Sequence, residues 1–209
     1  MNLNSPYNNF AKVFGHYEGR ELQSFVYHDK ETSPNHILSD EEIESLINLY
    51  ETSNKIETQI RDGVNEEYRK VKKVELGVTE HRHLPIYDKI CSAVFFTNGE
   101  FYKYHISGVI ENFEILKYES DESSFYKKHI DYGAGNLYPR KLSVVVQLSH
   151  PDEYEGCDTL LYVQEQRDML HKDKGCINIF PSFILHEVTP ITKGVRYALV
   201  GWINGPDWC

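Results

Sequence analysis

The sequence has no hydrophobic run long enough to cross a bilayer: no stretch approaches the roughly 18 uninterrupted apolar residues that mark a transmembrane helix. Its first residues, MNLNSPYNNF, have neither the basic segment nor the apolar segment of a secretory signal. We therefore expect a cytoplasmic protein that does not associate with membranes.

Basic residues are also scarce. The chain has 22 Lys and Arg against 32 Asp and Glu, a formal net charge of -10. An acidic surface repels phosphate backbones, so a nucleic acid is not expected as a partner. The one basic run, RKVKK at Arg69–Lys73, follows Glu66 and Glu67, and we interpret it as a solvated face.

Closely spaced cysteines, internal repeats and low-complexity tracts are absent as well. The four cysteines form no CxxC pair, so we expect free or buried thiols and neither a disulfide framework nor a zinc site. What remains is a chain of 209 residues with 40% hydrophobic and 13% aromatic residues, enough to bury the core of one domain.

Two helices are predicted in the first half, after a polar N-terminal extension over residues 1–36. Ser39 can cap the first helix, with Glu42 completing a capping box. Its apolar stripe follows at helical spacing: Ile43, Leu46, Ile47 and Tyr50. Pro85 suits the start of a second helix, which should end around Asn98 and Gly99. The domain would span 37–209.

The second half, from about residue 108, is rich in short β segments separated by turn residues. The expected strands are Phe113–Tyr118, Lys141–Ser149, Thr159–Val163, Cys176–Pro181, His186–Ile191 and Val195–Ile203. Even positions from Leu142 to Leu148 are all apolar, as in a strand with one face in a core. This pattern predicts a β-sandwich or barrel with the two helices packed outside.

The candidate chemistry begins with His129-Ile130-Asp131. On an extended backbone, residues i and i+2 point to the same face, so His129 and Asp131 can hold one metal ion. His186 opens a later strand that a barrel could bring alongside. Two imidazoles and one carboxylate form the facial triad of non-haem iron(II), which leaves coordination positions open.

Arg196 adds a second element to this pattern. We expect a turn at Lys193 and Gly194, after which the chain runs back antiparallel to the strand of His186. A fixed guanidinium there could bind a carboxylate through two hydrogen bonds. A dicarboxylate with a keto acid on iron and its far end on Arg196 fits 2-oxoglutarate. His81 and His83 form a rival pair, which we interpret as a surface feature because no partner is evident.

These residues carry a resemblance to a known family. Three segments resemble the catalytic core of the prolyl hydroxylases, above all the bacterial and phage prolyl/lysyl-hydroxylase (PKHD) type. These segments are FYKKHIDYG, LSVVVQLSHPDEYEGCDTLLY and INIFPSFILHEVTPITKGVRYALVGWINGPDW. The resemblance implies a double-stranded β-helix, or jelly roll, and an enzyme that uses Fe(II), 2-oxoglutarate and dioxygen. It also points to ascorbate as an accessory reductant and to a prolyl residue of a protein or peptide as the substrate.

The resemblance also assigns roles to individual residues. It implies iron ligation by His129, Asp131 and His186 and binding of the far carboxylate of 2-oxoglutarate by Arg196. It places Tyr118 against the co-substrate and makes Arg140 and Trp202 substrate contacts. For these last three residues, an ordinary core Tyr, a salt-bridging Arg and a core Trp are the alternatives.

The chain departs from the family pattern at two places. Gln147 stands where many relatives have a Tyr that contacts 2-oxoglutarate, and its amide can still donate a hydrogen bond to the co-substrate. Gly156-Cys157-Asp158 replaces the usual Gly-Gly before an acidic residue.

Two other functions stay open from sequence. One is the same chemistry on a lysyl residue, a free amino acid, a nucleobase or another small molecule. The other is a cupin-like barrel that binds metal or sugar without turnover. Arg196 separates the second from an oxygenase, because a non-catalytic barrel needs no buried anchor for a dicarboxylate.

Overall fold

The computed structural model describes residues 25–26, 37–58, 67–133, 137, 139–163 and 165–206. Most of the predicted extension 1–36 lies outside these residues. The helices and strands in chain order are β1 (Phe25–Val26), α1 (Asp40–Thr52), β2 (Ile56–Glu57), β3 (Arg69–Lys70), β4 (Lys72–Leu76), α2 (Leu84–Thr97), β5 (Phe113–Glu119), β6 (Phe125–His129), β7 (Arg140–Gln147), β8 (Tyr154–Gly156), β9 (Thr159–Val163), β10 (Gln166–Met169), β11 (Ile177–Pro181), β12 (Leu185–Val188) and β13 (Ile191–Asn204).

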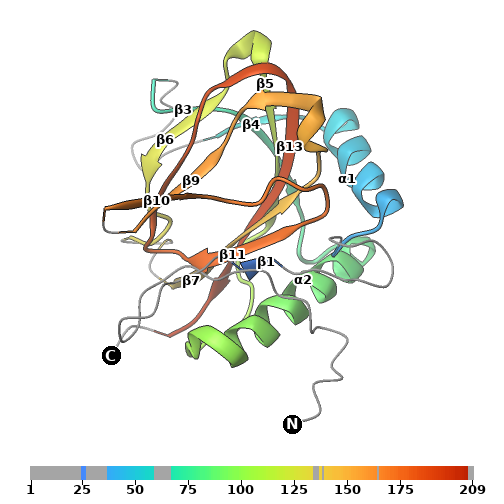
Figure 1. The fold of residues 1–209 in the computed structure, drawn as a ribbon. Coiled ribbons are helices and arrows are strands. Elements are labelled where there is room, and N and C mark those ends of the chain that lie inside the picture. Colours follow the sequence, from blue (N-terminus) through green and yellow to red (C-terminus); the bar gives the residue numbers. More distant parts are fainter. Residues whose placement is uncertain are drawn as a thin grey trace.

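The strands form two sheets in which neighbouring strands are antiparallel. The major sheet has the order β1-β11-β7-β13-β5-β4-β2, with β8 paired to β13. The minor sheet has the order β10-β9-β12-β6-β3. This arrangement confirms the predicted jelly roll (Figure 1). None of the helices among the described residues is long and apolar enough to cross a bilayer.

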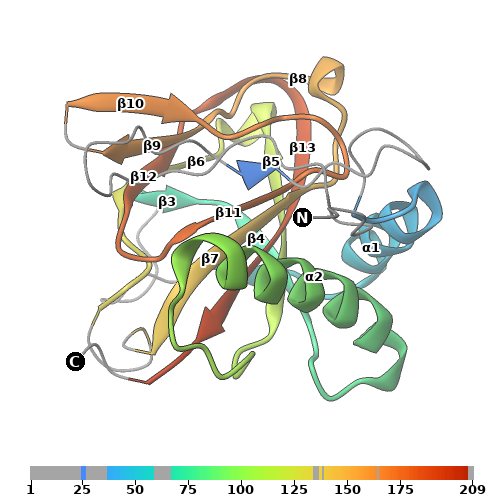
Figure 2. The ribbon, with the colours of Figure 1, turned by 60° about the horizontal axis from the view of Figure 1, so that its bottom comes forward.

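Both predicted helices are present and pack outside the major sheet. Ser39 and Glu42 form the capping box at the start of α1, and Ile43, Leu46 and Tyr50 are buried. The second helix ends at Thr97, after which one π-helical segment continues over Asn98–Tyr102. Figure 2 shows α2 lying across the sheet in front of β7 and β11.

Strand β7 shows how the alternating pattern separates two cores. All eight of its residues are buried. The even positions, Leu142 to Leu148, pack in the main hydrophobic cluster with α1 and α2. The odd positions, Ser143, Val145 and Gln147, face the space between the sheets. The helix side of the sheet is thus apolar, and the inner side is free to carry polar groups.

The predicted turn at Lys193 and Gly194 is wrong. Both residues lie inside β13, where they pair with β8, and the chain changes sheets at the two residues between β12 and β13. Strand β13 therefore runs in the major sheet and does not pair with β12. Gly194 has a φ of 75°, and a Cβ there would lie 2.0 Å from the Glu153 carbonyl oxygen. The glycine marks a close strand crossing, which looks the same as a turn in sequence.

Two surface interpretations need correction. The basic run is not a solvated face: the side chains of Arg69 and Lys73 are 11% and 17% exposed, and both form ion pairs with Glu114. His83 is buried, with its Nδ1 3.1 Å from the Gly77 carbonyl oxygen, although its neighbour His81 is exposed as expected. In both cases, the charged neighbours in the sequence suggested an exposed position, whereas the fold buries the side chain.

Candidate functional site

The two strands that carry the predicted metal ligands lie side by side in the minor sheet. Strand β6 ends at His129, and the antiparallel register of β6 and β12 places His129 directly opposite His186. Asp131 follows two residues after His129, and its backbone N–H donates to the Ser182 carbonyl. The predicted convergence of these side chains is what the structure shows.

Their ligand atoms meet at one point. His129, Asp131 and His186 each offer one atom, and these atoms lie within 4.8 Å of one another. Each His Nε2 is 3.6 Å from an oxygen of Asp131: His129 from Oδ1, and His186 from Oδ2. The cluster is a compact set of two nitrogens and one oxygen.

Backbone contacts orient both imidazoles. His129 Nδ1 lies 2.8 Å from the Lys127 carbonyl oxygen, and His186 Nδ1 lies 2.9 Å from the Ile184 carbonyl oxygen. A carbonyl accepts only, so each Nδ1 carries the proton and each Nε2 presents a lone pair to the cluster. A second ring nitrogen that donates to a backbone carbonyl is common among metal-ligating histidines.

The protonation states also suit a metal. Burial and the neighbouring His186 lower the pKa of His129 to about 3, so this imidazole is neutral at physiological pH. Burial opposes ionisation of Asp131, but His186, His129 and hydrogen bonds from Ser143 and Trp202 outweigh it and hold the pKa of the carboxyl below its usual range. Two imidazoles and a carboxylate are the donor set that binds Fe(II) with coordination positions left open.

Neighbouring side chains that the sequence analysis missed hold these ligands in place. Ser143 Oγ donates to Asp131 Oδ2 over 2.7 Å from the inner face of β7. The Tyr126 ring stacks on His129 at 3.4 Å between centroids, and the Arg69 guanidinium lies 4.5 Å from the centroid of the same ring. The only sequence signal for Ser143 was its place in the expected strand Lys141–Ser149, on the face opposite the apolar even positions.

Arg196 projects from β13 into the interior between the sheets. It is 2% exposed, and Tyr118 lies opposite it on β5, with the guanidinium 5.4 Å from the Tyr118 ring centroid. Its hydrogen-bond partners are neutral groups of Gln147, Cys157 and Thr159. Within the described residues, no carboxylate forms an ion pair with Arg196, so a buried positive charge is left without a counter-ion.

One cavity connects these features. Its volume is about 1490 Å³, and the three candidate ligands, Arg196 and Thr159 all lie in its wall. Tyr118, Arg140 and Trp202, predicted as co-substrate or substrate contacts, line it too. Gln147 is the one predicted site residue that is not part of this wall, because its side chain lies behind Arg196.

Arg140 also takes part in a contact network that reaches the ligand cluster. Its guanidinium forms two hydrogen bonds with the Glu111 carboxylate and lies 3.5 Å from the Trp202 ring centroid. Trp202 in turn helps to lower the pKa of the Asp131 carboxyl. Arg140 is thus a salt-bridging residue in the cavity wall, and Trp202 supports a ligand from the same wall.

The known proteins most informative for this chain belong to one family. The sequence profile of the 2OG-Fe(II) oxygenase superfamily matches residues 113–204. A PKHD-type hydroxylase of Gloeothece citriformis is 32% identical over 81 residues, 38% of this chain and 37% of the relative. A PKHD-type hydroxylase of Hyphomonas neptunium is 36% identical over 89 residues, 41% of this chain and 40% of the relative. The chain thus matches less than half the length of these curated relatives.

Solved structures share the fold. A prolyl hydroxylase of Trichoplax adhaerens, in complex with a hypoxia inducible factor oxygen degradation domain peptide, has a TM-score of 0.64 at 22% identity over 78% of this chain and 76% of its own. A Pseudomonas putida prolyl-4-hydroxylase has a TM-score of 0.63 at 17% identity over 82% and 90%. The region 113–204, which matches the 2OG-Fe(II) oxygenase superfamily profile, holds every candidate ligand and Arg196.

Proposed function

We propose that the protein is an Fe(II)- and 2-oxoglutarate-dependent dioxygenase. The observation that carries the proposal is a two-histidine, one-aspartate cluster in the same cavity as a buried guanidinium that has no counter-ion among the described residues. A cupin-like barrel that only binds metal or sugar would explain the first feature and not the second. Burying an uncompensated charge costs several kcal/mol by order of magnitude, so a fold keeps one where an anion binds.

Each residue would have a defined task in that reaction. His129, Asp131 and His186 would hold the iron, and Arg196 with Tyr118 would bind the far carboxylate of 2-oxoglutarate. Bound iron and co-substrate would supply the oxidation: dioxygen and 2-oxoglutarate are consumed, succinate and carbon dioxide are released, and one oxygen atom enters a substrate C–H bond. Ser143 and Trp202 would keep the Asp131 carboxylate oriented throughout.

For the substrate, we propose a prolyl residue of a protein or peptide. Two observations support this choice: the matched relatives carry the name PKHD-type hydroxylase, and the Trichoplax neighbour was solved with a peptide. The cavity wall is compatible with a side chain of low polarity, since the aromatic rings of Tyr126 and Trp202 lie near the ligand cluster. Arg140 and Trp202 are the proposed substrate contacts.

Several accompanying expectations are proposals as well. These are ascorbate as an accessory reductant, dioxygen as co-substrate, a cytoplasmic location, no membrane or nucleic-acid partner, and a division into an extension 1–36 and a domain 37–209. A lysyl residue, a free amino acid or another small molecule is the alternative substrate.

The test measures succinate formed from 2-oxoglutarate by the iron-loaded protein, with and without a candidate substrate. The wild type should form succinate, and His186→Ala should abolish it. Mass spectrometry of prolyl peptides, lysyl peptides and free amino acids from the same reactions should show a gain of one oxygen on the prolyl peptide. Undiminished succinate formation by the variant would refute the ligand assignment, and oxygen gained on another compound would refute the prolyl substrate alone.

A further inference from the structure

The polar group closest to the Arg196 guanidinium is the side chain of Gln147. Its Oε1 accepts hydrogen bonds from Arg196 Nε over 3.1 Å and from Nη2 over 2.9 Å. Both side chains are buried, with 2% exposure for each residue. Because Gln147 lies outside the cavity wall that contains Arg196, its amide supports the guanidinium from behind. The Nε and Nη2 edge of the guanidinium fork of Arg196 is therefore held by one oxygen, Gln147 Oε1.

The remaining neighbours of the guanidinium are uncharged. Burial raises the pKa of the Cys157 thiol, the Tyr118 hydroxyl and the Tyr154 hydroxyl, so all three are neutral at physiological pH. The contacts on the other edge are long: 3.6 Å to Cys157 Sγ and 3.4 Å to Thr159 Oγ1. These weak partners leave the positive charge and part of the fork available on the side where Thr159 and Arg196 line the cavity.

The orientation of the Gln147 amide is itself determined. Its Nε2 donates to the His171 carbonyl over 3.0 Å, and the Asn178 side chain donates to the same carbonyl over 3.2 Å. Asn178 Oδ1 also accepts from the His171 backbone N–H over 3.0 Å. A flipped amide would set its NH₂ against the guanidinium and its oxygen against a carbonyl, so only one orientation satisfies both ends.

We infer that Gln147 is a positioning residue for the co-substrate anchor. It orients the Arg196 fork through two hydrogen bonds, and its neutrality preserves the charge that the far carboxylate of a dicarboxylate needs. This inference rests on the proposed function for the identity of that dicarboxylate. It replaces the expected direct contact between Gln147 and 2-oxoglutarate with an action through Arg196. A carboxylate at position 147 would satisfy the same donors and cancel the charge.

The decisive variant is Gln147→Glu in the Mn(II)-loaded protein, with two ligands titrated by calorimetry or water-proton relaxation. 2-Oxoglutarate has both a keto acid for the metal and a far carboxylate, whereas oxalate has only the metal-chelating end. We expect Gln147→Glu to weaken 2-oxoglutarate binding by about tenfold or more, because the introduced carboxylate competes for Arg196. Oxalate, which does not reach Arg196, should bind as in the wild type.

Two further variants complete the experiment. Gln147→Leu keeps the charge of Arg196 but removes its support, so it should weaken 2-oxoglutarate binding by less than Gln147→Glu does, again without an effect on oxalate. If Gln147→Glu does not fold, the weaker 2-oxoglutarate binding expected of Gln147→Leu tests the inference instead. Asn48→Asp adds the same negative charge at an exposed position of α1 and should change the binding of neither ligand.

The outcomes separate the two claims. Wild-type affinity for 2-oxoglutarate in a folded Gln147→Glu, or in Gln147→Leu when the first variant does not fold, would overturn the inference. Equal losses for both ligands would do the same, because they would indicate a general disturbance of the barrel. A wild-type protein that binds oxalate and not 2-oxoglutarate would instead contradict the proposed function, on which the inference depends.

Discussion

The hydroxyl of Ser143 is the smallest group on which the candidate metal site depends. It donates to Asp131 Oδ2, so it limits the carboxylate to the orientation that faces both imidazoles. We expect Ser143→Ala to weaken Mn(II) or Fe(II) binding by about tenfold, in the range found when a hydrogen-bond partner of a metal ligand is removed. Metal titration with calorimetric detection measures the change.

Ser107→Ala is the matched control for this variant. Ser107 also loses a hydrogen bond, to the Asn204 carbonyl, but it contacts none of the three ligands. Metal affinity should be unchanged in the control. If Ser143→Ala binds metal as tightly as the wild type, the hydroxyl has no role in orienting Asp131.

At this scale, the sequence predicted the ligands better than their supports. His129 and Asp131 are two positions apart at the end of β6, so their spacing alone suggested that they could hold one ion. Ser143 contacts Asp131 from another strand, and Glu111 contacts Arg140 from a distant segment, and no local pattern records which segments become neighbours. Tyr126 lies on β6 with His129, where no pattern marked it as a support. Gln147 was recognised as a departure from the family, but its position behind Arg196 depends on the register between β7 and β13.

Among the elements, β13 is the strand that brings the anchor Arg196 into the cavity. Its path depends on Gly194, which has a φ of 75° and lies against the Glu153 carbonyl. We expect Gly194→Ala to lower the free energy of unfolding by about 1 to 3 kcal/mol from backbone strain, and by more because of the steric clash. Denaturant unfolding monitored by circular dichroism provides the measurement.

Gly99→Ala is the corresponding control, because a Cβ at Gly99 would meet no heavy atom within 4 Å. Its stability should stay close to that of the wild type. A Gly194→Ala protein as stable as the Gly99→Ala protein would show that the close crossing of β8 and β13 tolerates a side chain. The sequence could not distinguish this crossing from a turn, since glycine serves both.

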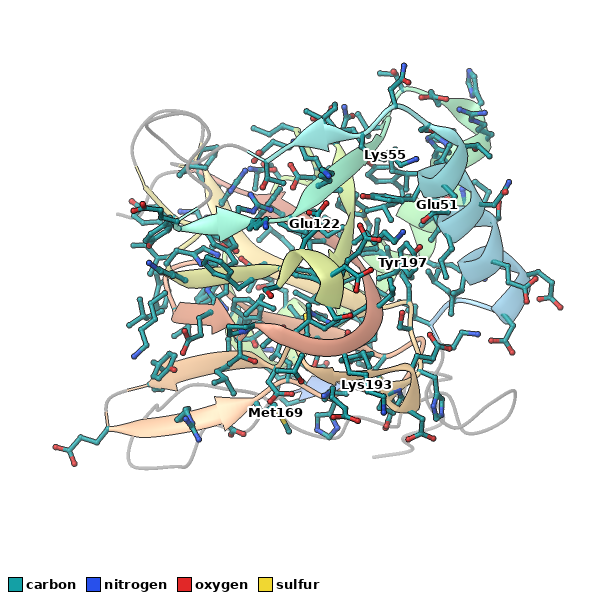
Figure 3. All side chains as sticks on the ribbon, turned by 90° about the horizontal axis from the view of Figure 1, so that it is seen from above. Glu51, Lys55, Glu122, Met169, Lys193 and Tyr197 are labelled. Atoms are coloured by element: carbon teal, nitrogen blue, oxygen red, sulfur yellow. The ribbon has the colours of Figure 1, made fainter. Side chains whose placement is uncertain are left out.

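Helix α1 is tied to the same strand by a polar contact. Tyr197 of β13 donates to the Glu51 carboxylate, and Lys117 Nζ lies 3.0 Å from it. Figure 3 shows Glu51 and Tyr197 near each other between α1 and the sheet. The Tyr197 hydrogen bond, together with Lys117, lowers the pKa of Glu51 below its ordinary value of 4.5 against the opposing effect of burial.

The pH dependence of this contact follows from the direction of the shift. A carboxyl with a lowered pKa stabilises the fold fully above its unfolded value, and the contribution disappears as the pH falls through the folded value. At pH 7, Glu51→Gln should lower the free energy of unfolding by up to about 1 kcal/mol, since the pair is partly exposed and screened. The difference from wild type should vanish as the pH falls well below 4.5.

Glu44→Gln, at an exposed position of the same helix, controls for the loss of one negative charge. Urea unfolding of the three proteins between neutral and acidic pH gives the comparison. A constant gap between Glu51→Gln and wild type across that range would show that the carboxylate charge is not what ties α1 to β13.

For the whole molecule, composition and periodicity predicted the architecture well. The alternation in β7 and the apolar stripes of α1 and α2 each determine which face is buried, and together they require two sheets with helices on one side. The candidate site is built from β6, β12 and β13 and from Asp131, which follows β6. Which strands pair could not be predicted, since pairing depends on contacts between distant segments.

Two strands of the minor sheet and one strand of the major sheet together build the proposed single site for Fe(II) and 2-oxoglutarate. The most direct test of this site is the visible absorption band of the iron–2-oxoglutarate chelate, recorded without oxygen. The band should develop in the wild type as 2-oxoglutarate is added, and it should be absent in His186→Ala at the same concentrations. A wild-type protein that shows no band, or a His186→Ala protein that shows it unchanged, would contradict the assignment of the site.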